Sequence, residues 1–498
     1  MLTIPAITTH YSLLRGFIKP DEAAKKCKEL GYTHCLLADN SLSGVVEFFS
    51  CMKKEGIVPI IGWKADGGYY IAKTLAGYKL LIRLVSGENI VYNDKDLQFY
   101  KDGELYLMEV CYANKEDAIL HRIVLCSGLK TTLKKAKDVD LGDLKKYFDS
   151  DKYHFKKPDM EITRDYSANN KLMLSLEDYT IFSKPKLPKV DCEGQTEDEY
   201  ITQLCREGWK KKFLNLKGEK KQEYADRVKY ELSIINGFGL AGYFLIVQDI
   251  IAYVRNNGWL PGPGRGSAGG CLVSYLLGIT EIDPVKYDLL FSRFLNSGRF
   301  SKDNISLPDI DMDVPSQYRD QIIEYLKNKY GHSRVFQMIT FGRLQGRSVI
   351  KEVARIYADL SFSELNEITE SLPQEASISD ELEEMDIKSV ILWTLENKPD
   401  KLAKWCKLDK EGNLTGELSD MFDLAIRIEG TYKSQGKHPA GVIISNDDLI
   451  NDAPLIKDKD GNPVVGFEMH DLDKVGLTKF DVLGVNLLDK IMEITNNE

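Results

Sequence analysis

The sequence lacks most features that mark secreted or membrane proteins. Its nine cysteines are scattered without a C-x-x-C pair, which disfavours a disulfide framework or a zinc site. No apolar run of about 18 residues is present. The start, MLTIPAITTHYSLLRGF, carries neither a basic leader nor a small-residue cleavage site. These absences predict a cytoplasmic protein with reduced thiols and no contact with a membrane.

A strong net positive charge is also missing, since the 498 residues carry a formal net charge of −10. Phosphate binding depends on local clusters, because salt confines the influence of a charge to about 8 Å. Between Arg255 and Arg355 there are fourteen Lys and Arg against ten Asp and Glu. The middle of the chain is therefore the place to look for nucleic-acid or nucleotide contacts.

The first 185 residues predict alternating helices and strands. Helices are expected at 22–31 and 44–56, and apolar strands at 33–39 and 57–63. This β/α alternation predicts a parallel sheet or a barrel. A proline-containing stretch around residue 187 predicts a linker.

The remainder has a different texture. In residues 197–253 apolar residues recur every three or four positions, which predicts helices. A polar helical region is expected from 343 to about 425. Between 436 and 485 three apolar strands are expected, in AGVIIS, PVVGFEM and LTKFDVLGV. At 498 residues the chain is long enough for two to four domains.

The segment LPGPGRGSAGG at 260–270 concentrates five glycines in eleven residues. Glycine lets a ligand approach the main chain without an intervening Cβ. A helix is expected over 268–277, with Ser267 as its N-cap and Gly278 at its end. Free N–H groups at a helix start, with Arg265 beside them, are typical of a phosphate site. A tight turn between two packed helices is the alternative.

Three kinds of phosphate loop compete for this segment. A Walker A loop needs Lys and then Ser or Thr after its last glycine, and Gly270-Cys271 excludes it. The dinucleotide fingerprint matches literally at Gly264-x-Gly266-x-x-Gly269, but Pro261 and Pro263 precede it where a buried strand is needed. The third kind is the Gly-Ser loop of nucleotidyltransferases, which requires carboxylates that bind a metal.

Such carboxylates follow in LPDIDMDVP. Asp309, Asp311 and Asp313 alternate with apolar residues, so on a strand all three project from one face, about 7 Å from one to the next. Divalent metal would relieve their repulsion, whereas an exposed acidic edge strand is the alternative. Asp481 is a further acid within the apolar strand LTKFDVLGV. The loop and these acids together indicate two-metal nucleotidyl transfer.

These stretches also carry a resemblance. The run GYFLIVQDIIAYVRNNGWLPGPGRGSAGG, followed by SLPDIDMDVP, VFQMITFGRLQGRSVIKEVARI, GKHPAGVIIS and LTKFDVLGVNLLDKI, resembles the C-family of bacterial replicative DNA polymerases, the DNA polymerase III alpha subunits. The motifs occur in the family's order over residues 242–491.

The resemblance implies a multidomain α/β protein with four segments. They are a PHP-type (β/α) barrel at 1–187, the first part of a beta-type nucleotidyltransferase palm (α+β) at 188–342, a helical thumb at 343–425 and the second part of the palm at 426–498. It further implies that Asp311, Asp313 and Asp481 are the catalytic residues and bind two Mg²⁺ ions, for which Mn²⁺ could substitute. Gly264, Arg265, Gly266, Ser267, Arg299 and Lys479 would bind the deoxynucleoside triphosphate.

A basic ridge completes the site expected from the resemblance. Arg343, Arg347, Lys351 and Arg355 recur every four residues, so on a helix they form one side while Val349, Val353, Ile356 and Leu360 face inward. Primer-template DNA would be held there by its phosphates. A merely solvated helix face is the alternative.

The PHP-like part departs from the family's metal-binding pattern. Ala6 and Thr8 stand at the His-x-His positions, Asn40 replaces the His after Asp39, and Lys64 replaces a Glu. His10 is a lone candidate for a residual ligand. These changes predict a scaffolding domain rather than a phosphoesterase.

The family's polymerases continue well beyond the third aspartate, through fingers and clamp-binding regions. We therefore expect activity to require a fingers region, either on a longer polypeptide or on a separate subunit of a split polymerase, in a bacterium or a phage-infected host. The sliding clamp would be reached through that region. A half-polymerase that is inert alone and a PHP-type phosphoesterase are the alternatives.

Overall fold

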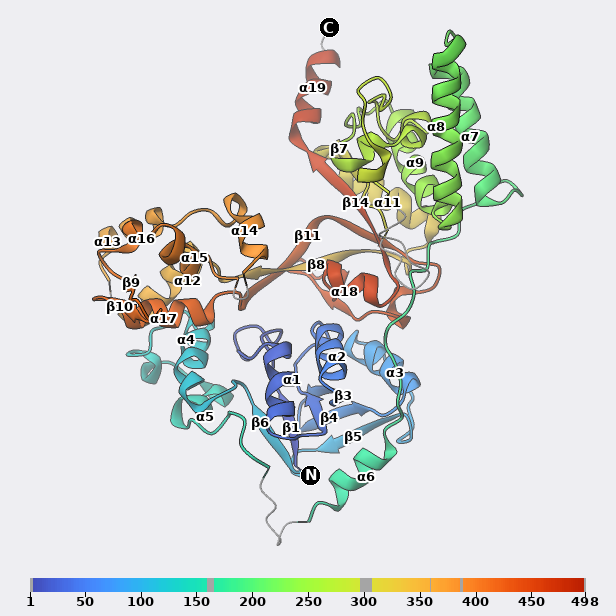
Figure 1. Cartoon of the computed structure of the whole chain (residues 1–498). Coiled ribbons are helices and arrows are strands. Elements are labelled where there is room, and N and C mark those ends of the chain that lie inside the picture. The colour runs from blue at the N-terminus through green and yellow to red at the C-terminus, as the bar shows by residue number, and fades with distance from the viewer. Residues whose placement is uncertain (1–2, 159–164, 296–306, 359, 386–387, 497–498) are drawn as a thin grey trace. The chain divides into compact units, whose positions relative to one another are not determined.

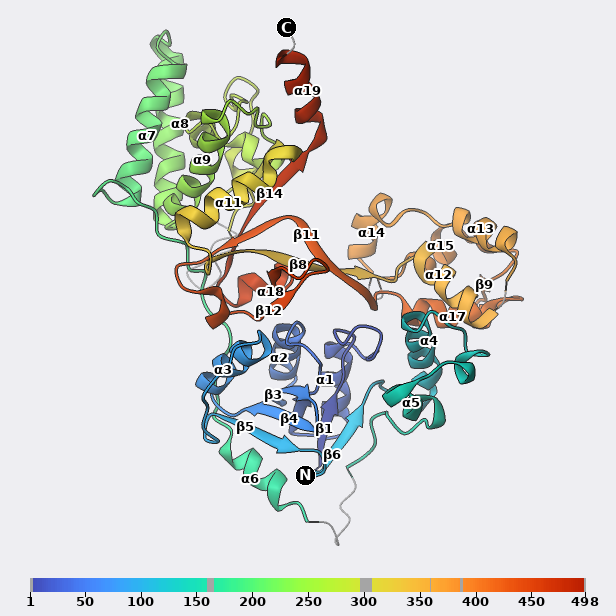
Figure 2. The same ribbon diagram turned by 180° about the vertical axis from the view of Figure 1, so that it is seen from behind.

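The computed structural model describes residues 3–158, 165–295, 307–358, 360–385 and 388–496 (Figures 1 and 2). The chain forms two compact units. The first contains Met1–Thr180 and Phe341–Gly436, and the second contains Ile181–Thr340 and Lys437–Glu498. Helices and strands alternate in a mixed α/β architecture, as the sequence predicts.

The first unit contains a six-stranded sheet in the order β5-β4-β3-β2-β1-β6. Its strands are β1 (Ile4–Ile7), β2 (His34–Leu37), β3 (Val58–Ala65), β4 (Gly68–Ala72), β5 (Leu97–Lys101) and β6 (Leu107–Val110). Strand β1 pairs in parallel with β2 and β6, and β2 pairs in parallel with β3. Apolar residues at strand positions, such as Ile7 and Leu36, are fully buried.

The prediction of a parallel sheet is wrong for the edge formed by β4 and β5. Strand β3 pairs antiparallel with β4, and β4 pairs antiparallel with β5. The cause is the two-residue connection Asp66-Gly67, in which Gly67 has φ +74°. Asp-Gly between apolar segments is a strong hairpin signal, and a parallel crossover would need a dozen or more residues.

The helices expected near this sheet are confirmed as α1 and α2, which lie side by side (Figures 1 and 2). In α2 the residues Val45, Phe48, Phe49 and Met52 share one face and are buried. The helices of this part are α1 (Pro20–Glu29), α2 (Val45–Lys54), α3 (Leu75–Val85), α4 (Ala118–Gly128), α5 (Lys145–Asp149) and α6 (Ser167–Ser175).

The helical region expected from residue 343 is confirmed in type and shares a hydrophobic core with α4. Ile123 and Val124 of α4 belong to the same core as Val349 and Phe422 of this region. The elements are α12 (Arg347–Val353), α13 (Phe362–Ser371), α14 (Ser379–Glu383), α15 (Val390–Asn397), α16 (Pro399–Leu402), α17 (Ser419–Ile428) and the short pair β9 (Lys407–Leu408) and β10 (Leu414–Thr415).

The basic ridge does not begin in this helix as predicted. Arg343 ends strand β8 (Val335–Arg343), and α12 starts only at Arg347, after Gly346 with φ +49°. The inward positions Val349, Val353 and Ile356 are buried as expected, although the last lies in a short π-helical stretch, Ala354–Ala358. Because strand β8 continues to Arg343, the helix can begin only after that residue.

The second unit is built on another six-stranded sheet, in the order β12-β13-β8-β11-β14-β7. The three apolar strands expected after residue 436 are confirmed. The remaining strands of this sheet are β7 (Asp311–Pro315), β11 (Tyr432–Ile444), β12 (Leu455–Lys457), β13 (Pro463–Val465) and β14 (Thr478–Val485). Strand β14 pairs in parallel with β7 and antiparallel with β11.

Most helices of this unit gather near the edge of the sheet formed by β7 and β14 (Figure 1). The helices of this unit are α7 (Glu197–Lys212), α8 (Gly218–Gly237), α9 (Ala241–Asn256), α10 (Leu272–Leu276), α11 (Arg319–Tyr330), α18 (Met469–Lys474) and α19 (Asn486–Asn496). Helix α9 is mostly buried, and its core includes Phe480 and Val482 of β14. In the described residues no single helix is long and apolar enough to cross a membrane; α8 and α9 meet that criterion only as a pair bent by 112°.

Candidate metal centre

Two neighbouring strands bring the predicted acids together. Strand β14 runs parallel to β7 with Asp481 opposite Asp311 and Leu483 opposite Asp313. Met312, between the two β7 acids, is buried, whereas the side chains of Asp311 and Asp313 keep 19% and 17% of their exposure. The alternation predicted from the sequence therefore places both carboxylates on one face of β7.

Three carboxylates lie close together, and the predicted ligand Asp313 is not among them. Ligand oxygens of Asp309, Asp311 and Asp481 all lie within 4.8 Å of one another. Asp481 is only 6% exposed, and its Oδ1 is buried without a hydrogen-bond partner. An unpartnered carboxylate oxygen is costly to bury, and oxygen ligands are those that Mg²⁺ prefers. The residues present therefore fit a divalent cation.

Two basic side chains contact these acids. Arg265 donates from Nη2 to Asp311 Oδ1 at 2.8 Å and from Nε to Asp313 Oδ1 at 3.0 Å. Lys479 donates from Nζ to Asp481 Oδ2 at 2.7 Å. One guanidinium thus bridges the two acids of β7, and it occupies oxygens that a metal ion would also use.

The electrostatics of the acids follow from burial and crowding. Burial raises the pKa of Asp311, the Arg265 guanidinium opposes this, and the neighbouring carboxylates of Asp481 and Asp313 raise the pKa further. Burial also raises the pKa of Asp309, against the effect of Lys479. The group therefore gains from any additional positive charge that enters it.

The glycine-rich segment lies directly against the acids. Gly262 donates its N–H to the Asp313 carbonyl at 2.8 Å, and a Cβ on Gly262 would lie 2.7 Å from the Asp313 Cβ. Gly264 and Gly266 have φ of +99° and +66°. A Cβ on Gly266 would lie 3.8 Å from Asp311 Oδ2. Glycine is therefore required here by close approach and by backbone conformation.

The helix expected after this loop is shorter than predicted. Gly266–Gly270 forms a 3₁₀ turn, and α10 begins at Leu272. Ser267 is not the N-cap; Cys271 is, with its Sγ accepting from the Ser274 N–H at 3.4 Å. The extended backbone of Cys271 separates turn from helix, and the adjacent glycines carry a high entropic cost in a helix.

The other predicted residues have mixed environments. Arg299 lies outside the described residues. Arg347 donates from Nε and Nη2 to the Leu372 carbonyl, and Arg355 donates to the Thr131 carbonyl and to Glu352, whereas Lys351 is exposed. Their role in DNA binding stays a prediction.

His438 is turned towards its own strand. Its Nδ1 accepts from the Gly441 N–H at 2.7 Å and from the Ala440 N–H at 3.2 Å. Burial lowers its pKa, and the Asp481 carboxylate opposes that effect. The ring is therefore held as an acceptor on one side, in its neutral form.

Tyr243 is a supporting residue that sequence reasoning missed. Its hydroxyl accepts from the Ile310 N–H at 3.2 Å, and its ring stacks on Phe480 at a centroid distance of 5.3 Å. It supports β7 and β14 from the core of α9. An aromatic residue in an apolar helix looks like ordinary core in the sequence, so no signal distinguishes it.

The PHP-like part holds its remaining acid differently. Asp39 is fully buried and accepts from the Thr9 N–H, the Thr9 hydroxyl and the Ser12 hydroxyl, at 2.6–2.7 Å. Burial raises its pKa to about 6, although these hydrogen bonds lower it. Lys64 donates to Asp102 at 2.5 Å.

His10, the lone candidate ligand, is also enclosed. Its ring stacks on Tyr432 at 4.2 Å, and both ring nitrogens are buried without hydrogen-bond partners. Burial lowers its pKa, and Lys19 and Arg343 lower it further. His10 therefore packs within an aromatic cluster of the first unit.

Comparisons with known proteins identify two families in this chain. The PHP domain family matches residues 7–240, and the family described as Bacterial DNA polymerase III alpha NTPase domain matches residues 199–484. The chain therefore belongs to the bacterial DNA polymerase III alpha family.

Individual relatives give the same result. The chain is 28% identical to the DNA polymerase III subunit alpha of Aquifex aeolicus, over 97% of this chain and 51% of the relative. It is 31% identical to the DNA polymerase III subunit alpha of Borreliella burgdorferi, over 98% of this chain and 49% of the relative. It is 35% identical to the DNA polymerase III subunit alpha of Pseudomonas aeruginosa, over 61% of this chain and 25% of the relative. The chain thus spans about half the length of most of these relatives.

Proposed function

We propose that this chain is the catalytic portion of a replicative DNA polymerase, which adds a deoxynucleoside monophosphate to a primer 3′-hydroxyl under the direction of a template. The observation that carries the proposal is the position of Asp481 beside Asp311, next to the glycine-rich loop. Membership of the polymerase III alpha family supports the same reaction.

Asp311, Asp313 and Asp481 would hold two divalent ions, Mg²⁺ in the cell and Mn²⁺ as a substitute. The unpartnered Asp481 Oδ1 and the closeness of Asp311 to Asp481 support two of these ligands, and Asp309 is the third acid of that group. Asp313 is assigned because its carboxylate shares the Arg265 guanidinium with Asp311. When bound, such ions would stabilise the negative charge that develops during phosphoryl transfer, both on the attacking hydroxyl oxygen and on the leaving pyrophosphate.

The chain's own residues bind and orient the triphosphate. Gly264, Gly266 and Ser267 provide a main chain that phosphate oxygens can approach closely, and Ser267 is exposed. Arg265 is 46% exposed and can leave the acids for the triphosphate, which would free Asp311 and Asp313. Lys479 holds Asp481 in place at 2.7 Å. Arg299 is assigned to the nucleotide from the resemblance alone.

The architecture proposed for this function follows the family. Residues 188–342 and 426–498 would form the palm, 343–425 the thumb, and 1–187 a degenerate PHP barrel that acts as a scaffold. The parallel pairing of β7 with β14, which places Asp481 opposite Asp311, supports the assignment of these segments to the palm. The three donors that saturate Asp39 support the scaffold over a phosphoesterase.

Primer-template DNA and a deoxynucleoside triphosphate are the proposed substrates. Exposed Lys351, with Arg343, Arg347 and Arg355 nearby in sequence, would contact the DNA backbone. A fingers region, on the same or a separate polypeptide, would complete the polymerase and provide its contact with a sliding clamp.

Primer extension tests the proposal. The chain is assayed with and without a supplied fingers-containing region, as wild type, Asp311→Asn and Asp481→Asn. Asp320→Asn is the matched control, since its side chain is 97% exposed. We expect extension by wild type and the control and its loss in the two site variants. Equal extension by Asp481→Asn and wild type would refute the site, whereas extension only with the supplied region would identify a half-polymerase.

A further inference from the structure

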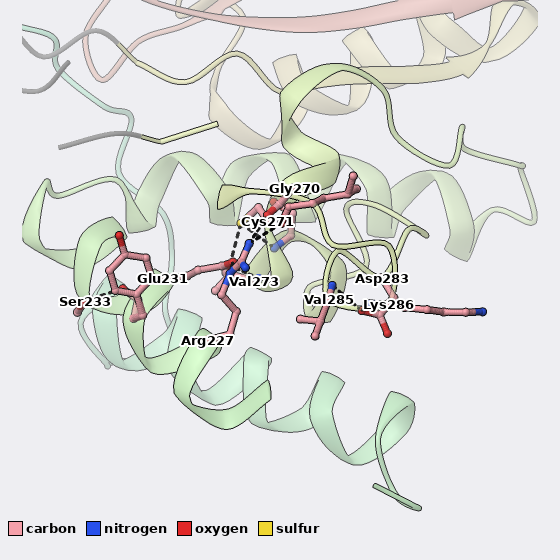
Figure 3. A network of polar contacts seen from close by, with 12 residues as sticks. Arg227, Glu231, Ser233, Gly270, Cys271, Val273, Asp283, Val285 and Lys286 are labelled. Carbon is pink, nitrogen blue, oxygen red and sulfur yellow. Dashed lines mark hydrogen bonds and ion pairs between the residues drawn. The ribbon is translucent and has the colours of Figure 1, made fainter. Parts of the chain in front are cut away.

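An ion pair inside α8 reaches the far end of the glycine-rich loop. Arg227 donates from Nε to Glu231 Oε1 at 2.6 Å, one helical turn apart. The Glu231 side chain is fully buried, and that of Arg227 is 24% exposed. Figure 3 shows both side chains directed towards Gly270, Cys271 and Val273.

Arg227 binds main-chain carbonyls of two segments. Its Nη2 donates to the Gly270 carbonyl at 2.9 Å and to the Leu289 carbonyl at 3.0 Å. Its guanidinium also lies over the Phe291 ring, 6.0 Å from the centroid. The planar fork of arginine suits several acceptors at once. Arg227 therefore joins the end of the loop to the segment at 289–291.

Glu231 binds the start of α10. Its Oε2 accepts from the Val273 N–H at 2.9 Å and from the Cys271 thiol at 3.3 Å. Burial raises the pKa of Glu231, and the Val273 N–H and Arg227 oppose this. A buried carboxylate with these donors is well satisfied, and removal of a donor would be costly.

The loop needs such an anchor because its many glycines offer few side chains to hold it. At its start, Gly262 is fixed by the hydrogen bond to the Asp313 carbonyl. At its end, Gly270 is fixed by Arg227. The exposed residues Gly266 and Ser267 lie between these two anchors.

We infer that Arg227 and Glu231 are positioning residues, which hold the end of the glycine-rich loop in the conformation that binds the triphosphate. The inference rests on the proposed function of this loop. A pair that merely stabilised α8 would need contacts within its own helix. Here the partners in the loop and α10 are 40 to 43 residues away in sequence.

The test uses Arg227→Lys, which keeps a positive charge beside Glu231 but loses the fork that reaches two carbonyls. Glu231→Gln is the second variant, and Lys229→Gln is the control, on the same helix with a side chain that is 77% exposed. Binding of dTTP with Mg²⁺ is measured by calorimetry. We expect affinity to fall about tenfold in both test variants and to stay unchanged in the control.

A second readout separates positioning from general stability. Alkylation of Cys271, which contacts Glu231, is compared by peptide mass spectrometry with that of Cys205, which is buried in the same core. We expect faster alkylation of Cys271 alone. Equal acceleration of both thiols would show general loosening and overturn the inference.

The two proposals fail in different ways. If wild type binds dTTP and Arg227→Lys binds it equally well, the positioning role alone is refuted. If wild type binds no dTTP, the triphosphate role of the loop fails, and the inference fails with it.

Discussion

Two buried acids of this chain, Asp481 and Asp39, have opposite surroundings. Asp481 lies beside other carboxylates and retains an oxygen without a hydrogen-bond partner. Both carboxylate oxygens of Asp39 accept hydrogen bonds, from one amide and two hydroxyls. The first arrangement calls for a cation, whereas the second is satisfied by the protein itself. The state of a carboxylate's hydrogen bonds therefore distinguishes the two sites better than the presence of an acid does.

The largest expected effect concerns metal binding at the two acids. Asp481→Asn should weaken Mn²⁺ binding about 100-fold, because it removes a charged oxygen ligand from a crowded site. Asp39→Asn should leave Mn²⁺ binding unchanged. Electron paramagnetic resonance titration of free Mn²⁺ measures both. A loss of binding in Asp39→Asn would show that the comparison is wrong.

The pH dependence of unfolding gives the next effect. Burial raises the pKa of Asp39 to about 6 in the folded chain, from an ordinary value of 3.8. Between these values the folded state binds more protons than the unfolded state, so stability falls as pH rises from about 4 to 6, by up to about 3 kcal/mol. Asp39→Asn should remove this fall. Urea unfolding of wild type and variant across this pH range measures the difference, and parallel curves would contradict it.

Arg265 provides a smaller and two-sided effect. Its guanidinium shares oxygens of Asp311 and Asp313 with the proposed metal. Arg265→Gln should therefore raise Mn²⁺ affinity and lower dTTP affinity, each by about tenfold or less. Electron paramagnetic resonance and calorimetry report the two affinities. A variant that lost affinity for both ligands would show that Arg265 only stabilises the acids.

The smallest effect is expected at the predicted DNA ridge. Lys351→Gln should weaken binding of a primer-template duplex a few fold and reduce the slope of log K against log salt by about 1. Arg347→Gln serves as the comparison, since Arg347 is held by the Leu372 carbonyl. Fluorescence anisotropy at several salt concentrations measures both. An unchanged slope for Lys351→Gln would indicate that this helix face does not contact DNA and is only solvated.

Local patterns predicted much of the fold. Alternation of acids with Met312 predicted that Asp311 and Asp313 share one face of β7, whereas Asp309 precedes the strand. Apolar spacing predicted α1 and α2. The pairing of β7 with β14 is a long-range contact, which the residues alone did not predict and only the family resemblance implied. The hairpin at Asp66-Gly67 carried a readable signal that the alternation of helices and strands obscured.

The missed features depend on contacts between distant segments. Arg227 and Glu231, four apart on a charged helix, look like a solvated surface pair in the sequence. Their burial arises from the loop and α10, about 40 residues further on. Ser267 is likewise a good N-cap by type, but the backbone of Cys271 takes that position.

The hydrogen bond between Gly262 and Asp313 constrains how this site can change in evolution. It fixes the loop against the acid strand so closely that a Cβ at position 262 would lie only 2.7 Å from the Asp313 Cβ and would clash with it. A single inserted or deleted residue between α9 and Gly262 would bring a larger side chain to that point. Selection should therefore act on the length of this connection as strictly as on the identity of the acids.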